Sequence, residues 1–436
     1  MLALRKPAWG VALYMLTFFA CPPYWWWGES LGDYRWNLYG GVILLVAVLL
    51  SRLSAEDDGG EKSRGQRWVI WTSIAILANA TLVHFLLAAD HEVSADSYTL
   101  LAKFVLLFLL IVAATRTLAD LRIILLAIVL GAGYIGYEAT INDRGQLSGG
   151  RLEGIGAAGV DDANGCASLM VTVLPIAGVL FLTGRRWEKL LMLPVAPFII
   201  NVILLCNSRG AFLAAIASAV VFLSVVPPPA RKQAIKLLAL GAVAVWLLLG
   251  DPRIIERFTT TFASEEDRDS SAAGRIEFWK SGLAMVADHP FGAGGDGFKK
   301  VHGPEYLARR DVHEARAIHN GYINEACEWG IQGLILRLCF VAGAAVLVWY
   351  TIRSCRKRDA TDGMLLGAAV LASMAAFLVT CLFGDRLDSE WGYWVPALAV
   401  GFARLFDRAA YQVDDLPEEM EEDLLPDEEE LQSLPV

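Results

Sequence analysis

Long apolar runs alternate with short polar segments along most of the chain. A helix needs roughly 20 mostly apolar residues to cross the hydrocarbon core of a bilayer. Irregular backbone cannot face lipid, so we predict that each run is helical. The twelve predicted spans cover residues 7–26, 36–52, 68–89, 97–115, 119–138, 165–183, 188–206, 209–226, 232–250, 328–350, 363–383 and 391–407. The pattern therefore predicts an all-α polytopic membrane protein with about 12 transmembrane helices.

Two polar segments interrupt this plan, residues 139–164 and the much longer 251–317. The stretch "GRIEFWKSGLAMVADHP" in the longer segment predicts a helix. One helical face carries Ile276, Trp279, Leu283 and Val286. We expect this face to lie on the membrane surface or to cover a cavity. The following "FGAGGDGF" ends the helix, and its glycines alone do not indicate a nucleotide site.

Lysines and arginines in short loops set the orientation of membrane helices. One set of loops holds twenty of them: Arg5, Lys6, Arg52, Lys62, Arg64, Arg67, Arg116, Arg122, Arg185, Arg186, Lys189, Arg231, Lys232, Lys236, Arg353, Arg356, Lys357, Arg358, Arg404 and Arg408. The opposite loops hold five: Arg35, Arg144, Arg151, Arg209 and Arg386. We therefore predict that both termini are cytoplasmic and that both polar segments face outward.

Composition agrees with a membrane protein, since 56% of the residues are hydrophobic and the mean hydropathy is +0.46. The net charge of −10 arises from the C-terminus, where "DDLPEEMEEDLLPDEEE" carries no basic residue. We predict a transmembrane domain over residues 1–410, containing the long loop 251–317, and a disordered cytoplasmic tail over 411–436. The acidic composition of this tail is consistent with a segment that is only solvated and with one that binds a partner. Seven cysteines without a C-x-x-C pair indicate neither a disulfide framework nor a zinc site.

Basic residues on the outward side are informative because they have no role as topology anchors. Arg209 lies in a short hinge between two spans, where an unpaired arginine costs up to about 2.5–3.5 kcal/mol, less near the interface. One alternative is that its side chain snorkels to lipid headgroups. Arg151, Arg275 and His319 map to the same side, however. Guanidinium groups suit diphosphates, and histidine suits proton transfer near neutral pH. These residues indicate a transferase with a diphosphate leaving group and a hydroxyl acceptor.

The stretch "AIHNGYINEACEWG", residues 317–330, places polar side chains directly before an apolar run. We expect Asn320, Asn324 and Glu325 to orient His319 or an acceptor sugar. Arg337 lies about two turns further on and either faces a cavity or pairs with Glu328 or an aromatic neighbour.

At these residues the chain resembles the superfamily of O-antigen ligases and O-antigen polymerases, which are bacterial membrane glycosyltransferases. "NSRGAFLAAIASAVVFL" (207–223) looks like the family's S-R-G-A followed by a span. "GRIEFWKSGLAMVADHPFGAGGDGF" (274–298) resembles its R-x-x-x-W helix and P-x-G-x-G, here with Arg275 and Trp279. "HNGYINEACEWGIQGLIL" (319–336) and "GRLEGIGAAGVDDANGCA" (150–167) are similar to two further motifs. The resemblance covers roughly residues 150 to 345.

The resemblance implies an inverting glycosyl transfer without metal or other cofactor, from a glycan on undecaprenyl diphosphate to a glycan, lipid or protein acceptor. Arg209 and Arg275 would neutralise the diphosphate, and His319 would act as the general base. Arg151, Asp161 and Asn164 would shape the donor side, with Trp279 among the substrate-binding residues. The family's D-P-N reads "DDAN" here, so either aspartate of the pair fits the motif. The expected setting is the bacterial inner membrane with a periplasmic active site, membrane lipids around it and no nucleic-acid partner.

Shared motifs do not separate a ligase from a repeat-unit polymerase. A polysaccharide or lipid transporter is the rival class, although the two halves show no internal repeat and the polar clusters lie at span ends. A scaffold role is the third alternative, and it would leave Arg209, Arg275 and His319 replaceable.

Overall fold

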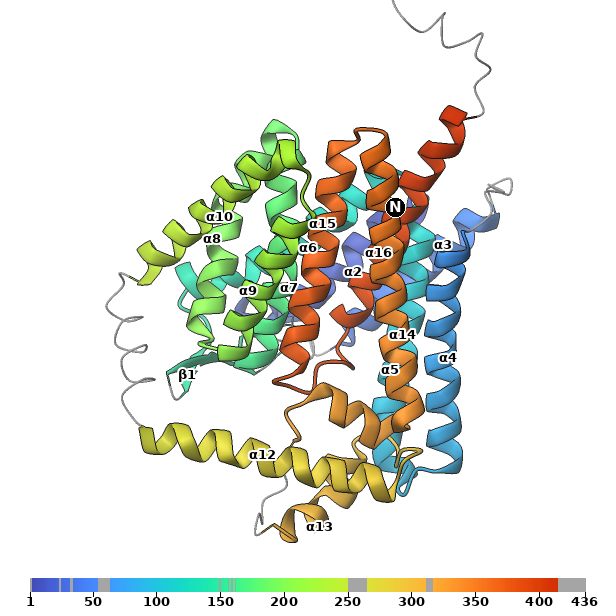
Figure 1. Cartoon of the computed structure of the whole chain (residues 1–436), viewed down its shortest axis with the longest axis vertical. Coiled ribbons are helices and arrows are strands. Elements are labelled where there is room, and N and C mark those ends of the chain that lie inside the picture. Colours follow the sequence, from blue (N-terminus) through green and yellow to red (C-terminus); the bar gives the residue numbers. More distant parts are fainter. Residues whose placement is uncertain are drawn as a thin grey trace, which may run out of the picture.

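The computed structural model describes residues 2–22, 25–31, 34–53, 63–148, 150–155, 157, 160, 162–249, 265–310 and 317–414. About 82% of the described residues are helical, which confirms the all-α class. The predicted spans coincide with helices α2 (Pro7–Phe19), α3 (Trp36–Leu53), α4 (Arg64–Leu86), α5 (His91–Ala114), α6 (Leu118–Ile141), α7 (Ala163–Thr183), α8 (Arg186–Leu205), α9 (Arg209–Val225), α10 (Pro228–Leu249), α14 (Gly321–Lys357), α15 (Thr361–Cys381) and α16 (Trp391–Asp414). Figure 1 shows them as a bundle.

Eight of the described helices are long and apolar enough to cross a membrane: α3 to α8, α14 and α15. Helices α2 and α9 are apolar but shorter, with 13 and 17 residues. The protein is therefore a multi-pass membrane protein, while the count of twelve spans and their sidedness stay predictions. The predicted tail lies outside the described residues from position 415 onward.

Helix α15 lies between two groups of helices, packing against α7 and α9 on one side and α14 and α16 on the other. Its buried positions include small residues such as Gly367, Ala368 and Ala372, which let neighbouring backbones approach closely. Large apolar side chains on the outside of the bundle are exposed, as at Ile216 and Val220 of α9, each 62% exposed. In a bilayer these side chains contact lipid rather than water.

A smaller unit covers one end of the bundle, which we call the loop end. It consists of α12 (Glu265–Asp288), η3 (Gly297–His302) and α13 (Gly303–Ala308), and α12 runs across the bundle beneath the ends of the spans (Figure 1). Met285 is fully buried there together with Ile318 and Cys327 of the α14 region, and Phe278 packs beside them.

The predicted apolar face of α12 is only partly buried. Trp279 and Val286 pack against the small core, whereas Ile276 and Leu283 are 49% and 56% exposed. The buried stripe is rotated toward Phe278 and Met285 because the helix packs on the start of α14.

Helix α14 is broken at Gly330, whose φ of 80° and ψ of 170° lie outside the helical region. The break frees backbone groups that a membrane cannot satisfy. The loop after α12 supplies the partners: the N–H groups of Ala293 and Gly294 donate to the carbonyls of Cys327 and Glu328, each at 3.0 Å. In return the Ile331 N–H donates to the Pro290 carbonyl at 2.9 Å. The "PFGAGG" stretch is therefore a backbone clasp on the broken helix, and we call residues 290–294 the clasp.

A substitution at Gly292 of the clasp would test this packing. The φ of Gly292 is 94°, and a Cβ there would lie 2.6 Å from both the Glu328 carbonyl oxygen and the Gly330 nitrogen. We expect Gly292→Ala to lower the unfolding temperature of the full chain in detergent by several degrees, because rigid backbone must move.

Gly154→Ala is the matched control, since Gly154 also has a positive φ, 65°, but nothing lies within 4 Å of its Cβ position. This variant should lower the free energy of unfolding only by the backbone strain of a residue with positive φ, about 1–2 kcal/mol. Equal losses for the two variants would contradict the clasp.

Candidate functional site

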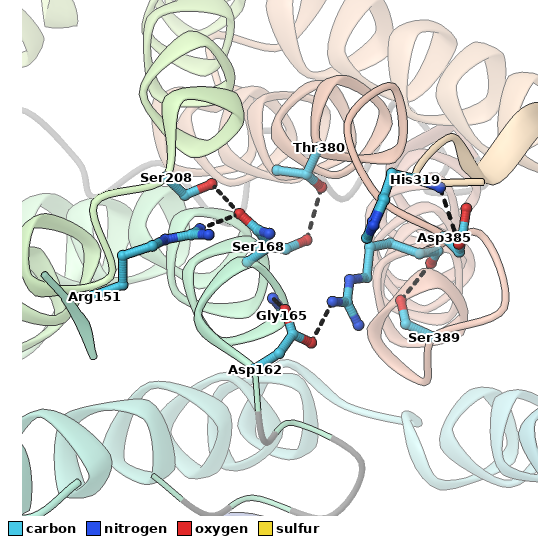
Figure 2. Close-up of polar contacts among 11 residues, drawn as sticks. Arg151, Asp162, Gly165, Ser168, Ser208, His319, Thr380, Asp385 and Ser389 are labelled. Carbon is cyan, nitrogen blue, oxygen red and sulfur yellow. Dashed lines mark hydrogen bonds and ion pairs between the residues drawn. The ribbon is translucent and has the colours of Figure 1, made fainter. Parts of the chain in front are cut away.

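Arg151 is held at the loop end by a short hairpin of β1 (Gln146–Ser148) and β2 (Arg151–Glu153). Its Nε donates to the carbonyl of Cys206 at 3.2 Å, and its Nη2 donates to Asn164 Oδ1 at 2.5 Å. Ser208 Oγ donates to the same Asn164 oxygen at 3.0 Å (Figure 2). Asn164 therefore joins Arg151 to the residue that precedes Arg209.

Arg209 is the first residue of α9, with Ser208 as its N-cap. The sharp turn from α8 requires a positive φ of 45° at Asn207, a residue type that tolerates this conformation. The hinge predicted from the sequence is thus a tight interhelical turn, and it places a guanidinium group at the loop end.

Arg275 lies on α12, far from the other two arginines in the sequence. Burial lowers its pKa, and repulsion from Arg151 and Arg209 lowers it further. The three guanidinium groups thus lie within electrostatic range of one another. Within the described ranges, none of the three forms an ion pair with a carboxylate. Since a guanidinium stays charged at any relevant pH, this arginine cluster favours the binding of an anion.

His319 precedes α14 and has a positive φ of 57°. Its backbone N–H donates to Asp385 Oδ2 at 3.2 Å (Figure 2). The Asn320 N–H donates to Asp385 Oδ1 at 2.9 Å. One carboxylate from the loop after α15 thereby fixes the backbone that carries the imidazole. Burial raises the pKa of Asp385, although the two N–H donors oppose this shift.

Helix α12 also reaches the histidine. The ring of Phe278 lies with its centroid 6.3 Å from that of His319, and Arg275 is three residues away on the same helix. Residues three apart lie on one side of a helix. The arginine cluster and His319 are therefore joined through α12.

An ion pair between Asp162 and Arg386 Nη2 links the two halves of the site from the other direction (Figure 2). Asp162 is the N-cap of α7 and accepts a hydrogen bond from the Gly165 N–H at 2.9 Å. Burial tends to raise its pKa, but Arg386 and the backbone donors outweigh burial and lower it overall.

The remaining predicted residues have different surroundings. Asn320 caps α14, accepting from the N–H groups of Tyr322 and Ile323, so its role is local. Asn324 is buried. The Trp279 indole N–H is buried and has no hydrogen-bond partner in the described structure, which leaves a donor for a ligand. Asp161 lies outside the described residues.

Glu325 does not join the histidine. It pairs with Arg337, with Nε to Oε1 at 3.1 Å, and both side chains are almost fully buried. Arg337 also packs over the ring of Tyr393 at 4.8 Å. The predicted aromatic neighbour of Arg337 is thus present, whereas its acidic partner is Glu325 rather than Glu328. The pair spans the break in α14, because its members lie on opposite sides of Gly330.

Sequence reasoning did not single out Asp385, left Asp162 as one of two aspartates that fit the "DDAN" motif, and counted Arg386 only as an outward basic residue. For Arg386 the sequence did contain a signal, because it is one of the few basic residues in the predicted outward loops.

Residues 190–338 match the family model described as O-antigen ligase, and this range holds Arg209, Arg275 and His319. This part of the chain is therefore similar to the O-antigen ligase family, in agreement with the resemblance of its motifs.

A curated relative is the teichuronic acid biosynthesis protein TuaE of Bacillus subtilis (strain 168). It is 21% identical over 211 residues, which cover 47% of this chain and 42% of the relative. The chain therefore matches less than half of that protein's length.

The contact between Asp162 and Arg386 is testable by a double-mutant cycle. Asp162→Asn keeps a good N-cap but removes the charge, and Arg386→Gln removes the other charge. We expect the double variant to lose less stability than the sum of the single variants, with a coupling of about 0.5–3 kcal/mol from unfolding of the purified protein.

The exposed pair of Arg309 and Glu305 is the control, with side chains 55% and 65% exposed. If the coupling energy of Asp162 and Arg386 is no larger than that of this control pair, their ion pair does not link the two halves of the site.

Proposed function

We propose that the protein is a metal-independent, inverting glycosyltransferase that moves a glycan from undecaprenyl diphosphate to an acceptor hydroxyl, in the manner of an O-antigen ligase. The observation that carries this proposal is the cluster of Arg151, Arg209 and Arg275, which has no acidic partner among the described residues, together with the contact of Phe278, on the helix that carries Arg275, with His319.

The arginine cluster would act on the leaving group. As the bond between the anomeric carbon and the phosphate oxygen breaks, the diphosphate gains negative charge. Fixed cations stabilise this charge more in the transition state than in the ground state, which is the condition for faster chemistry. They supply the positive charge that a divalent ion provides in other transferases. Asn164 would hold Arg151 in place for this task.

His319 would act on the acceptor. The acceptor oxygen attacks the anomeric carbon from the face opposite the diphosphate, and its proton passes to the imidazole. A new glycosidic bond forms, the old bond to phosphate breaks, and undecaprenyl diphosphate leaves. Asp385 would position the histidine through the backbone, and the Trp279 indole N–H would be available to a sugar hydroxyl.

In this proposal the site faces the periplasm of a bacterial inner membrane, with both termini in the cytoplasm. Residues 1–410 form the transferase domain, and the acidic residues 411–436 form a cytoplasmic tail. The common location of Arg151, Arg209, Arg275 and His319 at the loop end supports the predicted sidedness, because the charge count had assigned all four to one side.

Two other functions predict different outcomes when the products are analysed. A polymerase of the same superfamily would use the same site to build a ladder of repeat units on lipid, whereas a ligase would leave glycan on a core, lipid or protein. A transporter would move the lipid-linked glycan without releasing undecaprenyl diphosphate.

We expect Arg209→Ala, Arg275→Ala and His319→Ala each to lower the rate of undecaprenyl diphosphate release by about 10²–10³, because each removes a charged or proton-accepting group from the transition state. The assay uses purified protein, a lipid-linked glycan and an acceptor, with chromatography of the products.

Arg309→Ala is the matched control, since Arg309 lies in the same loop unit but is 55% exposed and paired with Glu305. Arg275→Lys should retain part of the rate, because it keeps the charge and loses the bidentate geometry. Full activity in the three alanine variants would overturn the proposed site.

A further inference from the structure

A small cavity lies at the break in α14, between α5, α14 and α16. Its volume is about 20 Å³, which is room for a single water molecule. Glu328 of α14 and Asp388 of the loop after α15 both line this cavity, and Glu328 is only 4% exposed. Ser97 and Tyr393 add hydroxyl groups, and the rest of the wall consists of leucine and aromatic side chains. Two carboxyl groups therefore face one small space.

The two carboxyl groups have no cation of their own. Each nearby cation already has another carboxylate as its partner: Arg337 pairs with Glu325, Arg386 with Asp162, and Lys300 with Asp296. Among the residues that the structure describes, neither Glu328 nor Asp388 forms an ion pair. Two ionised carboxylates at one buried cavity repel each other strongly, because the interior screens charge far less than water does. A single proton held between them removes this repulsion.

The hydroxyl of Tyr393 is a separate indication that the cavity holds a hydrogen-bonding ligand. The Tyr393 side chain is fully buried, and its hydroxyl has no hydrogen-bond partner in the described structure. Arg337 packs over the face of the ring, 4.8 Å from its centroid. A buried hydroxyl without a partner is unfavourable, and native structures normally satisfy such groups with protein or with ordered water.

We propose that this cavity is a proton-binding site, in which Glu328 and Asp388 share one proton across a single bridging water molecule. One carboxyl is then protonated and donates to the water, and the other is ionised and accepts from it. The Tyr393 hydroxyl completes the hydrogen bonds of the water. Binding of the proton changes the charge of the pair from −2 to −1, and no other atom is exchanged. This inference does not depend on the proposed function.

The electrostatic surroundings support such a site. Burial is the main cause that raises the pKa of Asp388 to about 6, and repulsion from Asp385 adds to it, against the attraction of Arg386 and Arg337. The other titratable and charged groups that face the pair are Glu325 and Cys327 of α14, Cys381 of α15, Tyr393 of α16, and Asp296 and Lys300 of the loop unit. The cations among these groups do not outnumber the carboxylates, so the charge of the pair stays uncompensated.

The cavity joins the break in α14 to the loop that holds His319. Glu328 lies two residues before Gly330, and its carbonyl accepts the clasp hydrogen bond from Gly294. Asp388 lies three residues after Asp385, whose carboxylate accepts the backbone N–H of His319 at 3.2 Å. Loss of the shared proton would therefore push this loop away from the break, close to the point where it orients the histidine.

The shared proton predicts a loss of stability as the pH rises. The unfolded chain releases carboxyl protons near their ordinary pKa of about 4. The folded pair keeps its proton until the pH passes about 6, so the folded state binds the additional proton between these values. Stability is then lost as the pH rises through this window. We expect the unfolding temperature of the full chain in detergent to fall by several degrees from about pH 5 to about pH 9, a range that includes the raised pKa values of buried carboxyls.

Glu328→Gln and Asp388→Asn test whether the pair causes this fall. Each variant leaves a single carboxyl without a like charge beside it, so each should abolish most of the fall. The double variant should have no larger effect than either single variant, because one shared proton can be removed only once. Glu305→Gln is the matched control, since the Glu305 side chain is 65% exposed and lies outside the cavity. This control should retain the fall of the unaltered protein.

Infrared spectroscopy provides a second measurement. The unaltered protein should show the carbonyl band of a protonated carboxyl at neutral pH, and this band should be absent from the spectrum of either single variant. An unchanged fall in both single variants, or additive effects in the double variant, would overturn the inference. A higher unfolding temperature in sodium chloride than in choline chloride at alkaline pH, seen in the unaltered protein but not in Asp388→Asn, would also overturn it, because the cavity would then hold a cation. None of these measurements requires glycan transfer, so they decide the inference whether or not the proposed function holds.

Discussion

The break in α14 is the constraint on which the loop end depends. A broken helix inside a bilayer leaves backbone groups that no water can reach, and each unsatisfied group costs several kcal/mol. The clasp satisfies these groups through hydrogen bonds with the backbone of Cys327, Glu328 and Ile331. The Asn79 side chain of α4 also donates to the Trp329 carbonyl at 2.9 Å. The loop unit is thus fixed to the bundle by backbone hydrogen bonds in addition to the small apolar core around Met285.

This clasp also explains how residues distant in sequence reach one site. It anchors the end of α12 against α14, so the same helix that carries Arg275 lies over the start of α14, where His319 is. The Glu325–Arg337 ion pair bridges the break within the bundle, and its near-complete burial makes each charge depend on the other. The Asp162–Arg386 pair then ties the loop after α15 to the start of α7, beside Asn164, which holds Arg151.

Sequence patterns predicted the elements far better than their contacts. Run length located the helices because a bilayer imposes a minimum length. Charge bias assigned Arg151 and Arg209 to one side, and the structure brings both to the loop end. Periodicity predicted an apolar face of α12, of which Trp279 and Val286 pack against the small core while Ile276 and Leu283 are exposed; it did not single out Met285, which is fully buried. The clasp could not be predicted from the sequence. Its glycines allow two backbone segments to approach closely, and the pattern of side chains does not indicate such contacts. Asp385 was missed because its role is to accept two backbone N–H groups from a segment 65 residues away, a contact that only the fold creates.

The electrostatics of the arginine cluster bear on the kind of ligand that the site favours. A guanidinium group keeps its charge at any relevant pH, so the mutual repulsion of the three arginines persists. The unliganded protein therefore holds an unfavourable arrangement of charge that a bound anion relieves, and a diphosphate at the interface is an anion of suitable charge and depth. A lipid-linked diphosphate diffuses in the plane of the membrane, however, and charge alone does not distinguish it from anionic phospholipids. In the proposed function, selection of the donor must therefore come from contacts beyond the diphosphate.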